Sequence, residues 1–563
     1  MLSETTLLGW FDWAVIGGYF LIVALIAWRS SKKQDSATDY FLGGRNIGWF
    51  AIGASLFASN IGSEHIVGLA GQGASTGMAM AHYELHAWLL LMLGWVFVPF
   101  YYQSGIFTMP EFLEKRFNST ARWILSLVSL SAYVLTKVSV TVYAGALVFQ
   151  ALMPTTFGTA ENAFWVGAIA TVILTGAYTV FGGLRAVLYT DAVQAVILLF
   201  GAIFILVLGL NRLGGWGELQ AFAGADIGRF ALWRPLSDPD FPWAGVLFAS
   251  PIVGLWYWCT DQYIVQRTLA AKDLSTARRG AMFGSLLKIS PVLIFLVPGL
   301  IGAALHAKGI ISIPLRSDGS INGDMVFPTL VTSLLPAGIR GLVVAGLLAA
   351  LMSSLSSLFN SSASLFTVDV YQKLRPAAGQ RELVRVGRLA TTVVVVLGLL
   401  WIPVMKMVSS GGLYQYLKNV QGYLAPSITA VFLLGLFWKR CNGPGAVWGL
   451  SLGFLMGMSK LTCQAFFSGS GNAGKWSEPA FLAAVADFNW LYASAVIFIL
   501  SILIMVVASL LTAPQNQSEL ANVTYASLDH KSVRASWNRW DVLGTAMIIL
   551  LILTIYLYFS FWI

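Results

Sequence analysis

Polar residues interrupt a long apolar run at "SNIGSEHIVGLAG" (59–71), where Asn60, Gly62, Ser63, Glu64 and His65 follow one another closely. Backbone polar groups in lipid must be paired, so a helix break at membrane depth occurs only where it is buried in protein or lines a water-filled cavity. Free carbonyls and half-helix ends at such a break can bind a cation or a polar solute. The stretch is therefore a candidate binding site. The alternative is a packing kink whose Asn and Ser bond to neighbouring helices.

A second interruption has the same character. In "GLWYWCTDQYIVQRT" (254–268) an apolar segment carries Thr260, Asp261 and Gln262 among aromatic residues. Each interrupted segment is followed by four further long apolar segments, over about 48–211 and 243–437. Interrupted segments at corresponding positions of two halves are typical of inverted-repeat transporters, whose binding site lies between the broken helices.

A helix rich in hydroxyl groups is predicted at "AALMSSLSSLFNSSAS" (349–364). Ser353, Ser356 and Ser357 share one helix face through their i, i+3 and i+4 spacing, and Ser354 lies beside them. For most of these serines close helix packing is the favoured interpretation. A hydroxyl face turned toward a broken helix would, however, supply the hard oxygen donors that suit a small hard cation.

Charged residues inside apolar segments are the sharpest signal, because each is costly in lipid unless it faces a partner or an aqueous path. Glu84 and Lys288 can either form a structural ion pair or bind the hydroxyls of a solute. Nearby aromatic rings offer faces for a sugar ring to stack on, whereas Lys460 is expected to snorkel toward an interface. The charged residues within or beside these segments are Glu64, Glu84, Lys137, Asp191, Asp261, Lys288, Lys418 and Lys460.

The elements that must position these residues are membrane helices. Of 563 residues, 57% are hydrophobic and only 10% are charged, which is far outside the range of a soluble domain. About fourteen apolar windows of roughly 20 residues, the length that crosses a bilayer, recur along the chain. They lie near 9–28, 48–71, 80–104, 122–151, 163–181, 186–211, 243–266, 280–305, 325–371, 389–408, 411–437, 441–465, 483–512 and 541–562. The predicted fold is all-α and polytopic, with a discontinuous first helix in each repeat. The first segment lacks a basic start and a cleavage site, so we expect a retained helix rather than a signal peptide.

The positive charge is explained by topology. Roughly 22 of the 34 basic residues fall in loops on one side if the N-terminus is outside, as the positive-inside rule requires. An even number of segments then places both termini outside a plasma membrane. The +9 net charge therefore does not indicate a nucleic-acid partner.

The sequence disfavours a disulfide-stabilised protein, a metal site built from Cys or His, and an enzyme. Cys259, Cys441 and Cys463 form no spaced pair, so neither a disulfide framework nor a zinc site is expected. The histidines near the first interruption match no metal-ligand spacing. An enzyme is not expected, because no nucleophile, metal or acid–base set gathers near one membrane face, and no organic cofactor is implied.

The residues that carry a family resemblance are "DYFLGGRNIGWFAIGASLFASNIGSEHIVGLAG", "MPEFLEKRFN", "GGLRAVLYTDAVQ", "LWYWCTDQYIVQR", "MSSLSSLFNSSASLFTVDVY" and "YLAPSITAVFLLGLFWKR". Over about 39–465 the chain resembles the sodium:solute symporter family, specifically its sodium/glucose cotransporter branch. The resemblance implies two inverted five-helix repeats within fourteen helices, and sodium-driven uptake by alternating access. Residues 1–40 would then form an N-terminal helix and loop, residues 41–437 the core, and residues 438–563 three C-terminal helices with a cytoplasmic linker at about 513–540.

The resemblance also implies site residues. The main sodium site maps onto the carbonyls of Ala58, Ile61 and Ala350 and the hydroxyls of Ser353 and Ser354. A second sodium site maps onto Asp191, Ser356 and Ser357. The sugar site maps onto Asn60, His65, Glu84, Tyr257, Trp258 and Lys288, with Tyr257 as the inner gate.

Lys418 departs from the branch, which usually has Gln there. Lys offers three donors and a charge where Gln offers a donor and an acceptor. This difference counts against glucose or galactose in particular and leaves room for another sugar, a polyol such as inositol, or an acidic sugar. The expected partners are sodium, such a substrate and the lipid bilayer, with no obligate protein partner. The rival functions are proton coupling, transport of a non-sugar solute, a sodium-gated channel, and a sugar sensor that does not transport.

Overall fold

The computed structural model describes residues 8–30, 36–154, 156–225, 229–316, 319–408, 413–467, 476–516 and 520–560. Over these residues the ordered elements are helices, joined by loops with a few isolated β-bridges. Ten helices are long and apolar enough to cross a membrane. The structure is therefore the predicted all-α, polytopic one.

The first part of the chain contains the first interrupted span and a long helix, α11. The elements are α1 (Trp10–Ser30), α2 (Ala37–Leu42), η1 (Gly43–Arg45), α3 (Trp49–Asn60), α4 (Ser63–Ser75), η2 (Gly77–Met80), α5 (Ala81–Glu84), α6 (Ala87–Met92), η3 (Leu93–Phe97), α7 (Val98–Gln103), α8 (Met109–Arg116), α9 (Ser119–Ala132), η4 (Tyr133–Val138), α10 (Ser139–Leu152), α11 (Ala160–Leu213) and α12 (Trp216–Ala225).

The second part of the chain also begins with an interrupted span, which is followed by further long helices and by the C-terminal helices. The elements are α13 (Trp243–Leu255), η5 (Trp256–Thr260), α14 (Gln262–Leu269), α15 (Leu274–Lys288), η6 (Val292–Leu296), α16 (Val297–Ala307), η7 (Gly323–Met325), α17 (Val326–Leu334), α18 (Ile339–Ser364), η8 (Leu365–Tyr371), α19 (Gln372–Leu374), α20 (Gln380–Val408), α21 (Leu413–Phe437), α22 (Gly443–Phe466), α23 (Ala480–Asp487), α24 (Trp490–Leu511), η10 (Tyr525–Ser527), α25 (His530–Ala535) and α26 (Arg539–Ser560).

Both interruptions predicted from the sequence are breaks in the helical backbone. Between α3 and α4, Ile61 and Gly62 have ψ angles of 89° and 176°, outside the helical range. Between η5 and α14, Asp261 is extended with ψ 127°. The η5 turn before it is π-helical, a distortion that is frequent at functional sites. The last carbonyls of α3 and of η5 therefore lose their regular intrahelical partners.

Helix α11 joins two predicted spans, 163–181 and 186–211, across a kink. Gly183 there has φ 55° and ψ −163°, a conformation essentially restricted to glycine. The single span predicted at 325–371 is instead divided into α17 and α18 by a turn at residues 335–338. The total of fourteen spans and the domain boundaries stay predictions.

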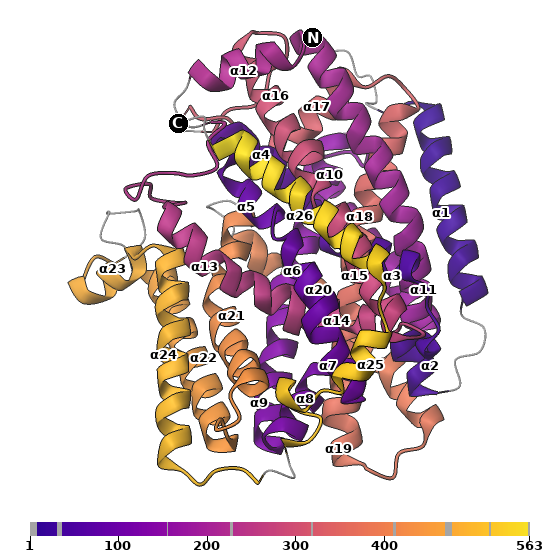
Figure 1. Cartoon of the computed structure of the whole chain (residues 1–563). Helices are drawn as coiled ribbons and strands as arrows, with labels where there is room; N and C mark the ends of the chain where they lie inside the picture. The colour runs from indigo at the N-terminus through magenta and orange to yellow at the C-terminus, as the bar shows by residue number, and fades with distance from the viewer. Residues whose placement is uncertain are drawn as a thin grey trace.

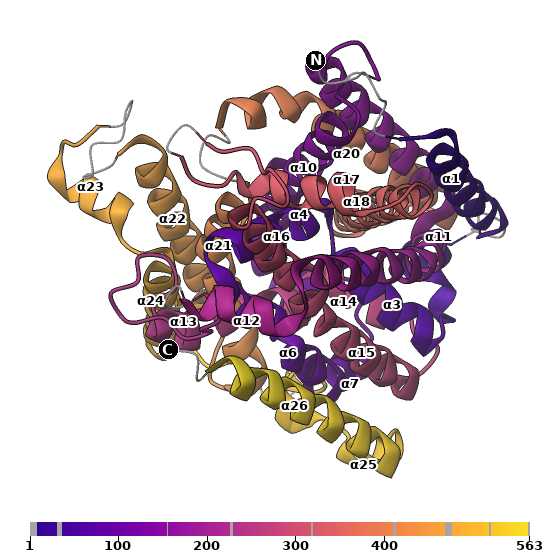
Figure 2. The same cartoon turned by 90° about the horizontal axis from the view of Figure 1, so that it is seen from above.

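The interrupted helices lie inside the bundle. Helix α18 packs along α11, and α3 packs against α15, α11 and α18. Helices α21, α22 and α24 stand together on one side of this core, whereas α26 runs along another edge (Figures 1 and 2). The first residues of α1 and the last residues of α26 lie toward the same end of the molecule (Figure 1). The first described helix therefore begins, and the last one ends, on the same side, as an even number of spans requires.

The outer surface is apolar. Large side chains are exposed on α1, α11, α24 and α26, for example Trp28, Phe181, Leu503 and Leu550. A soluble protein rarely exposes so extensive an apolar surface, so these faces are the ones that contact lipid.

Candidate functional site

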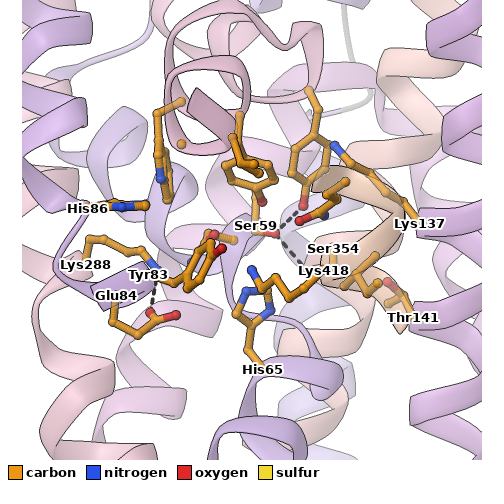
Figure 3. Close-up of a pocket in the computed structure, with 18 of the residues that line it drawn as sticks. Ser59, His65, Tyr83, Glu84, His86, Lys137, Thr141, Lys288, Ser354 and Lys418 are labelled. Carbon is orange, nitrogen blue, oxygen red and sulfur yellow. Dashed lines mark hydrogen bonds and ion pairs between the residues drawn. The ribbon is translucent and has the colours of Figure 1, made fainter. Parts of the chain in front are cut away.

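A pocket lies between the two broken helices (Figure 3). Its walls come from α3 and α4 at the first break, from η5 at the second, and from α5, α15 and α21 around them. All seven residues predicted to bind substrate line it: Asn60, His65, Glu84, Tyr257, Trp258, Lys288 and Lys418. The side chain of Glu64, beside the first break, is outside the described residues.

Glu84 and Lys288 form a buried ion pair on one side of this pocket (Figure 3). Lys288 Nζ donates to Glu84 Oε2, and the ammonium lies 5.5 Å from the centre of the Trp258 ring. The sequence predicts two alternatives for Glu84 and Lys288: a structural ion pair, or binding to the hydroxyls of a solute. The structure is compatible with both, because the two residues are paired and also line the pocket.

Three buried polar atoms at the pocket have no hydrogen-bond partner within the described part of the chain: Asn60 Nδ2, the Tyr83 hydroxyl and Glu84 Oε1. Leaving a buried donor or acceptor unpaired costs about 1–3 kcal/mol. The set contains an amide donor, a hydroxyl and a carboxylate acceptor. Such groups are complementary to the hydroxyls of a bound solute, which both donate and accept hydrogen bonds.

Lys418 faces the same space. Its Nζ lies 4.9 Å from the centre of the Tyr83 ring, within the range of a cation–π contact. The side chain is 8% exposed. In Figure 3 Lys418 and His65 lie between the Glu84–Lys288 pair on one side and Lys137 and Thr141 on the other.

The second break is held by a charge pair that joins distant segments. Lys137 Nζ donates to Asp261 Oδ2 at 2.5 Å, and the Tyr133 hydroxyl donates to Asp261 Oδ1. Four aromatic rings surround the ammonium with centres 4.7–5.0 Å away. One of them is Tyr257, the predicted inner gate. Lys137 and Asp261, which had no assigned role from sequence, therefore hold the second break beside Tyr257.

The predicted ion-site residues come together where α3, α11 and α18 meet. The Ser354 hydroxyl donates to the Ser59 carbonyl at 3.1 Å, beside the first break. The Ser353 hydroxyl donates to Asp191 Oδ1 at 2.7 Å. A hydroxyl that gives its proton to another acceptor still has lone pairs for a cation. Ser353 and Ser354 therefore fit a sodium ion chemically.

Asp191 of α11 joins this cluster from the other side. Besides Ser353 it accepts hydrogen bonds from Ser55 at 2.5 Å and from Ser59 at 3.0 Å. Ser357 lies 2.9 Å from the Ser59 hydroxyl, while Ser356 donates to the Ser353 carbonyl at 2.9 Å. The residues predicted for a second ion are thus adjacent to those predicted for the first.

Arg267 is the residue of this cluster that sequence reasoning missed. It lies on α14 and is completely buried, with its guanidinium among the hydroxyls of Ser55, Ser59 and Ser357. It follows the second interruption, just beyond the predicted span 243–266. A charge search extended by one residue would have found it.

Two other expectations concern histidine and lysine. Among the described residues no group of three or more His, Cys, Asp or Glu side chains could hold a metal ion. His82 instead contacts the Leu232 carbonyl, and His86 contacts the Ser250 hydroxyl. Lys460 does not snorkel toward an interface; it is 5% exposed and donates to the Ala486 carbonyl at 2.7 Å, because that buried carbonyl offers the ammonium an acceptor.

The chain is similar to curated transporters over nearly its whole length. It is 38% identical over 552 residues to "Sodium/glucose cotransporter 4" of Danio rerio, covering 93% of this chain and 82% of that protein. It is 38% identical over 553 residues to "Sodium/myo-inositol cotransporter" of Mus musculus, covering 92% and 75% of the two chains. These relatives are transporters and not enzymes.

The fold is shared with a solved structure. A Na+-coupled sialic acid symporter in a substrate-bound outward-open state aligns with a TM-score of 0.74 at 23% identity, over 90% of this chain and 99% of that one. The profile of the sodium:solute symporter family matches residues 40–453. With its two broken helices, its central polar pocket and this match over most of its length, the chain belongs to the sodium:solute symporter family.

Proposed function

We propose that this chain is a sodium-driven symporter that takes up a sugar or polyol across the plasma membrane by alternating access. The observation that carries the proposal is the set of buried, unsatisfied polar atoms of Asn60, Tyr83 and Glu84 in the pocket. A ligand rich in hydroxyls would satisfy them, while the rings of Tyr257 and Trp258 offer apolar faces for its C–H groups. The sugar and inositol transporters among the relatives support the same substrate class.

The proposed substrate site consists of Asn60, His65, Glu84, Tyr257, Trp258, Lys288 and Lys418. Glucose, galactose and related rings carry hydroxyls that could pair with its donors and acceptors, as do inositol and an acidic sugar. Lys418 is the residue whose type separates these substrates, because it brings a charge where the branch usually has an amide.

The proposed main sodium site consists of the carbonyls of Ala58, Ile61 and Ala350 with the hydroxyls of Ser353 and Ser354. All five ligands are neutral oxygens, which suit a hard metal cation better than a proton. Asp191, Ser356 and Ser357 form the proposed second sodium site. Asp191 is the group in these two sets that could relay a proton, so proton coupling would depend on it.

Coupling between sodium and substrate would follow from a difference in the affinity of sodium for the two conformational states. Sodium would stabilise the outward-open state in which the substrate site is formed, and substrate would in turn raise the affinity for sodium. With both termini outside, the membrane potential drives each positive charge inward with about 2.3 kcal/mol per 100 mV. Loss of sodium to the cytoplasm would then loosen the site and let the substrate leave past Tyr257.

The test is uptake into proteoliposomes with an inward sodium gradient and an equal potassium gradient as the control. The panel is labelled glucose, galactose, myo-inositol and glucuronate. We expect saturable accumulation of at least one of these above its external concentration, with sodium only.

Other outcomes would redirect the proposal. Binding without accumulation would indicate a sensor, and flux that never exceeds the external concentration would indicate a channel. If none of the four compounds binds or accumulates, the assignment to sugars and polyols is wrong and the solute is of another class.

A further inference from the structure

Arg267 connects the second helix break to the ion site. It belongs to α14, the half-helix that begins directly after the break at Asp261. Its guanidinium crosses to α3, where Nε lies 3.0 Å from the hydroxyls of both Ser55 and Ser59. Nη2 lies 2.6 Å from Ser59 Oγ and also donates to the Ser357 hydroxyl of α18.

The same hydroxyls separate Arg267 from Asp191. Ser55 and Ser59 each donate a proton to the Asp191 carboxylate, at 2.5 and 3.0 Å, and accept hydrogen bonds from the guanidinium. Asp191 and Arg267 are both completely buried. The layer of hydroxyls thus mediates a buried charge pair between α11 and α14.

These contacts occupy oxygens that a cation would need. A hydroxyl oxygen has two lone pairs, and arginine donors already point at those of Ser59 and Ser357. A sodium ion at the same oxygens would lie within a few ångströms of the guanidinium. Two like charges at that distance in a buried site repel strongly. The guanidinium in its observed position and a sodium ion bound to Ser357 and Asp191 therefore exclude each other.

We propose that Arg267 is a resident cation that competes with sodium for the hydroxyls of Ser59 and Ser357 and for neutralisation of the Asp191 carboxylate, to which Ser59 connects it. Sodium binding at the second position displaces the guanidinium, and this proposal rests on the sodium coupling of the proposed function. Arg267 is then a positioning residue for transport, since it contacts the ion site but no substrate group.

Displacement of the Arg267 guanidinium would affect the substrate pocket through the contacts of α14. Arg267 Nη1 donates to the Tyr263 carbonyl, and the Tyr263 hydroxyl donates to the Ser59 carbonyl at the first break. Tyr263 also lines the pocket, with its ring centre 6.1 Å from that of Tyr257. Ion occupancy can thus be transmitted to the inner gate by a short chain of contacts.

The experiment is equilibrium binding of ²²Na+ to the purified protein without sugar, so that its readout does not depend on transport. In Arg267→Gln the competitor is lost while the carboxylate stays, and we expect sodium to bind at least tenfold more tightly than in the wild type. In Arg267→Lys the gain should be smaller, because an ammonium retains the charge but lacks the planar fork of donors. The double variant Arg267→Gln with Asp191→Asn should lose this increase in sodium affinity, because the carboxylate is then absent.

The matched control is Arg278→Gln. Arg278 is also completely buried but donates to the Gly94 carbonyl and to Ser536, away from the ion site. Its sodium affinity should stay within twofold of the wild type.

Unchanged or weaker sodium binding by folded Arg267→Gln would overturn the proposal. If that variant is not recovered folded, sodium binding by Arg267→Lys is the test instead, and unchanged or weaker binding by Arg267→Lys would overturn the proposal. Absence of sodium binding and of sodium-stimulated uptake in the wild type would instead refute the proposed function itself.

Discussion

At the scale of single residues, Lys418 is the pocket side chain most open to a test of specificity. Its ammonium lies against Tyr83 in the wall of the pocket. A charge-assisted hydrogen bond to a substrate contributes about 1.5–3 kcal/mol. Lys418→Gln should therefore raise KM for the transported substrate by about tenfold or more, with the sodium dependence unchanged. The measurement is initial uptake rate against substrate concentration at saturating sodium.

Lys460→Gln is the control for that substitution. Lys460 is equally buried, but it donates to the Ala486 carbonyl outside the pocket. It should leave KM unchanged. An unchanged KM in Lys418→Gln as well would place Lys418 outside the substrate contacts.

The proposed main sodium site gives a second prediction at this scale. Replacing both Ser353 and Ser354 by Ala removes two of five proposed ligands, so sodium stimulation of uptake should disappear. The paired control is Ser362→Ala with Ser364→Ala on the same helix region, whose buried hydroxyls have no hydrogen-bond partner among the described residues. Sodium-stimulated uptake that persists in the Ser353 and Ser354 variant would contradict the site.

At the scale of elements, the kink of α11 positions Asp191. Gly183 has a positive φ, and a Cβ there would lie 2.6 Å from the Tyr40 carbonyl oxygen. We expect Gly183→Ala to lower the unfolding temperature markedly and to weaken sodium binding, because α11 cannot keep both its kink and its contact with α3. Thermal unfolding in detergent, with and without sodium, measures both effects.

Gly217→Ala is the control for the helix kink. Gly217 lies within α12, and nothing is within 4 Å of a Cβ at that position. Alanine is favoured over glycine in a helix by about 1 kcal/mol, so this variant should be as stable as the wild type or more so. A Gly183→Ala protein as stable as the wild type would show that the kink is not required.

At the scale of the whole molecule, the start of α1 and the end of α26 share one side of the bundle (Figure 1). The basic loops predict that this side is outside. A cysteine at exposed Leu236 should then react with an impermeant maleimide added to intact cells, whereas one at exposed Arg381 should react only after permeabilisation. The native Cys259 and Cys441 are buried and Cys463 is partly buried, so background labelling of native cysteines should be low. The reverse labelling pattern would invert the proposed topology, and the membrane potential would then drive sodium into the protein from the face now assigned to the cytoplasm.

The sequence by itself determined the membrane class, the family, both helix breaks and the hydroxyl-bearing face. These are local properties, because composition, apolar length and the i, i+3, i+4 period of a helix are set by neighbours in the chain. The family resemblance, since confirmed, placed Asn60, Glu84 and Lys288 in one site, and the structure brings them to one pocket. The roles assigned to the site residues stay predictions.

Only the tertiary structure decided which charges meet. Lys137 pairs with Asp261 across 124 positions of sequence. Arg267 of α14 donates to the Ser59 hydroxyl of α3, and Ser59 in turn donates to Asp191 of α11. No local pattern encodes such pairs, because the attraction between two buried charges depends on how helices pack and not on their spacing in sequence. That packing turns a lone arginine at the end of an apolar segment into the proposed competitor of the coupling ion.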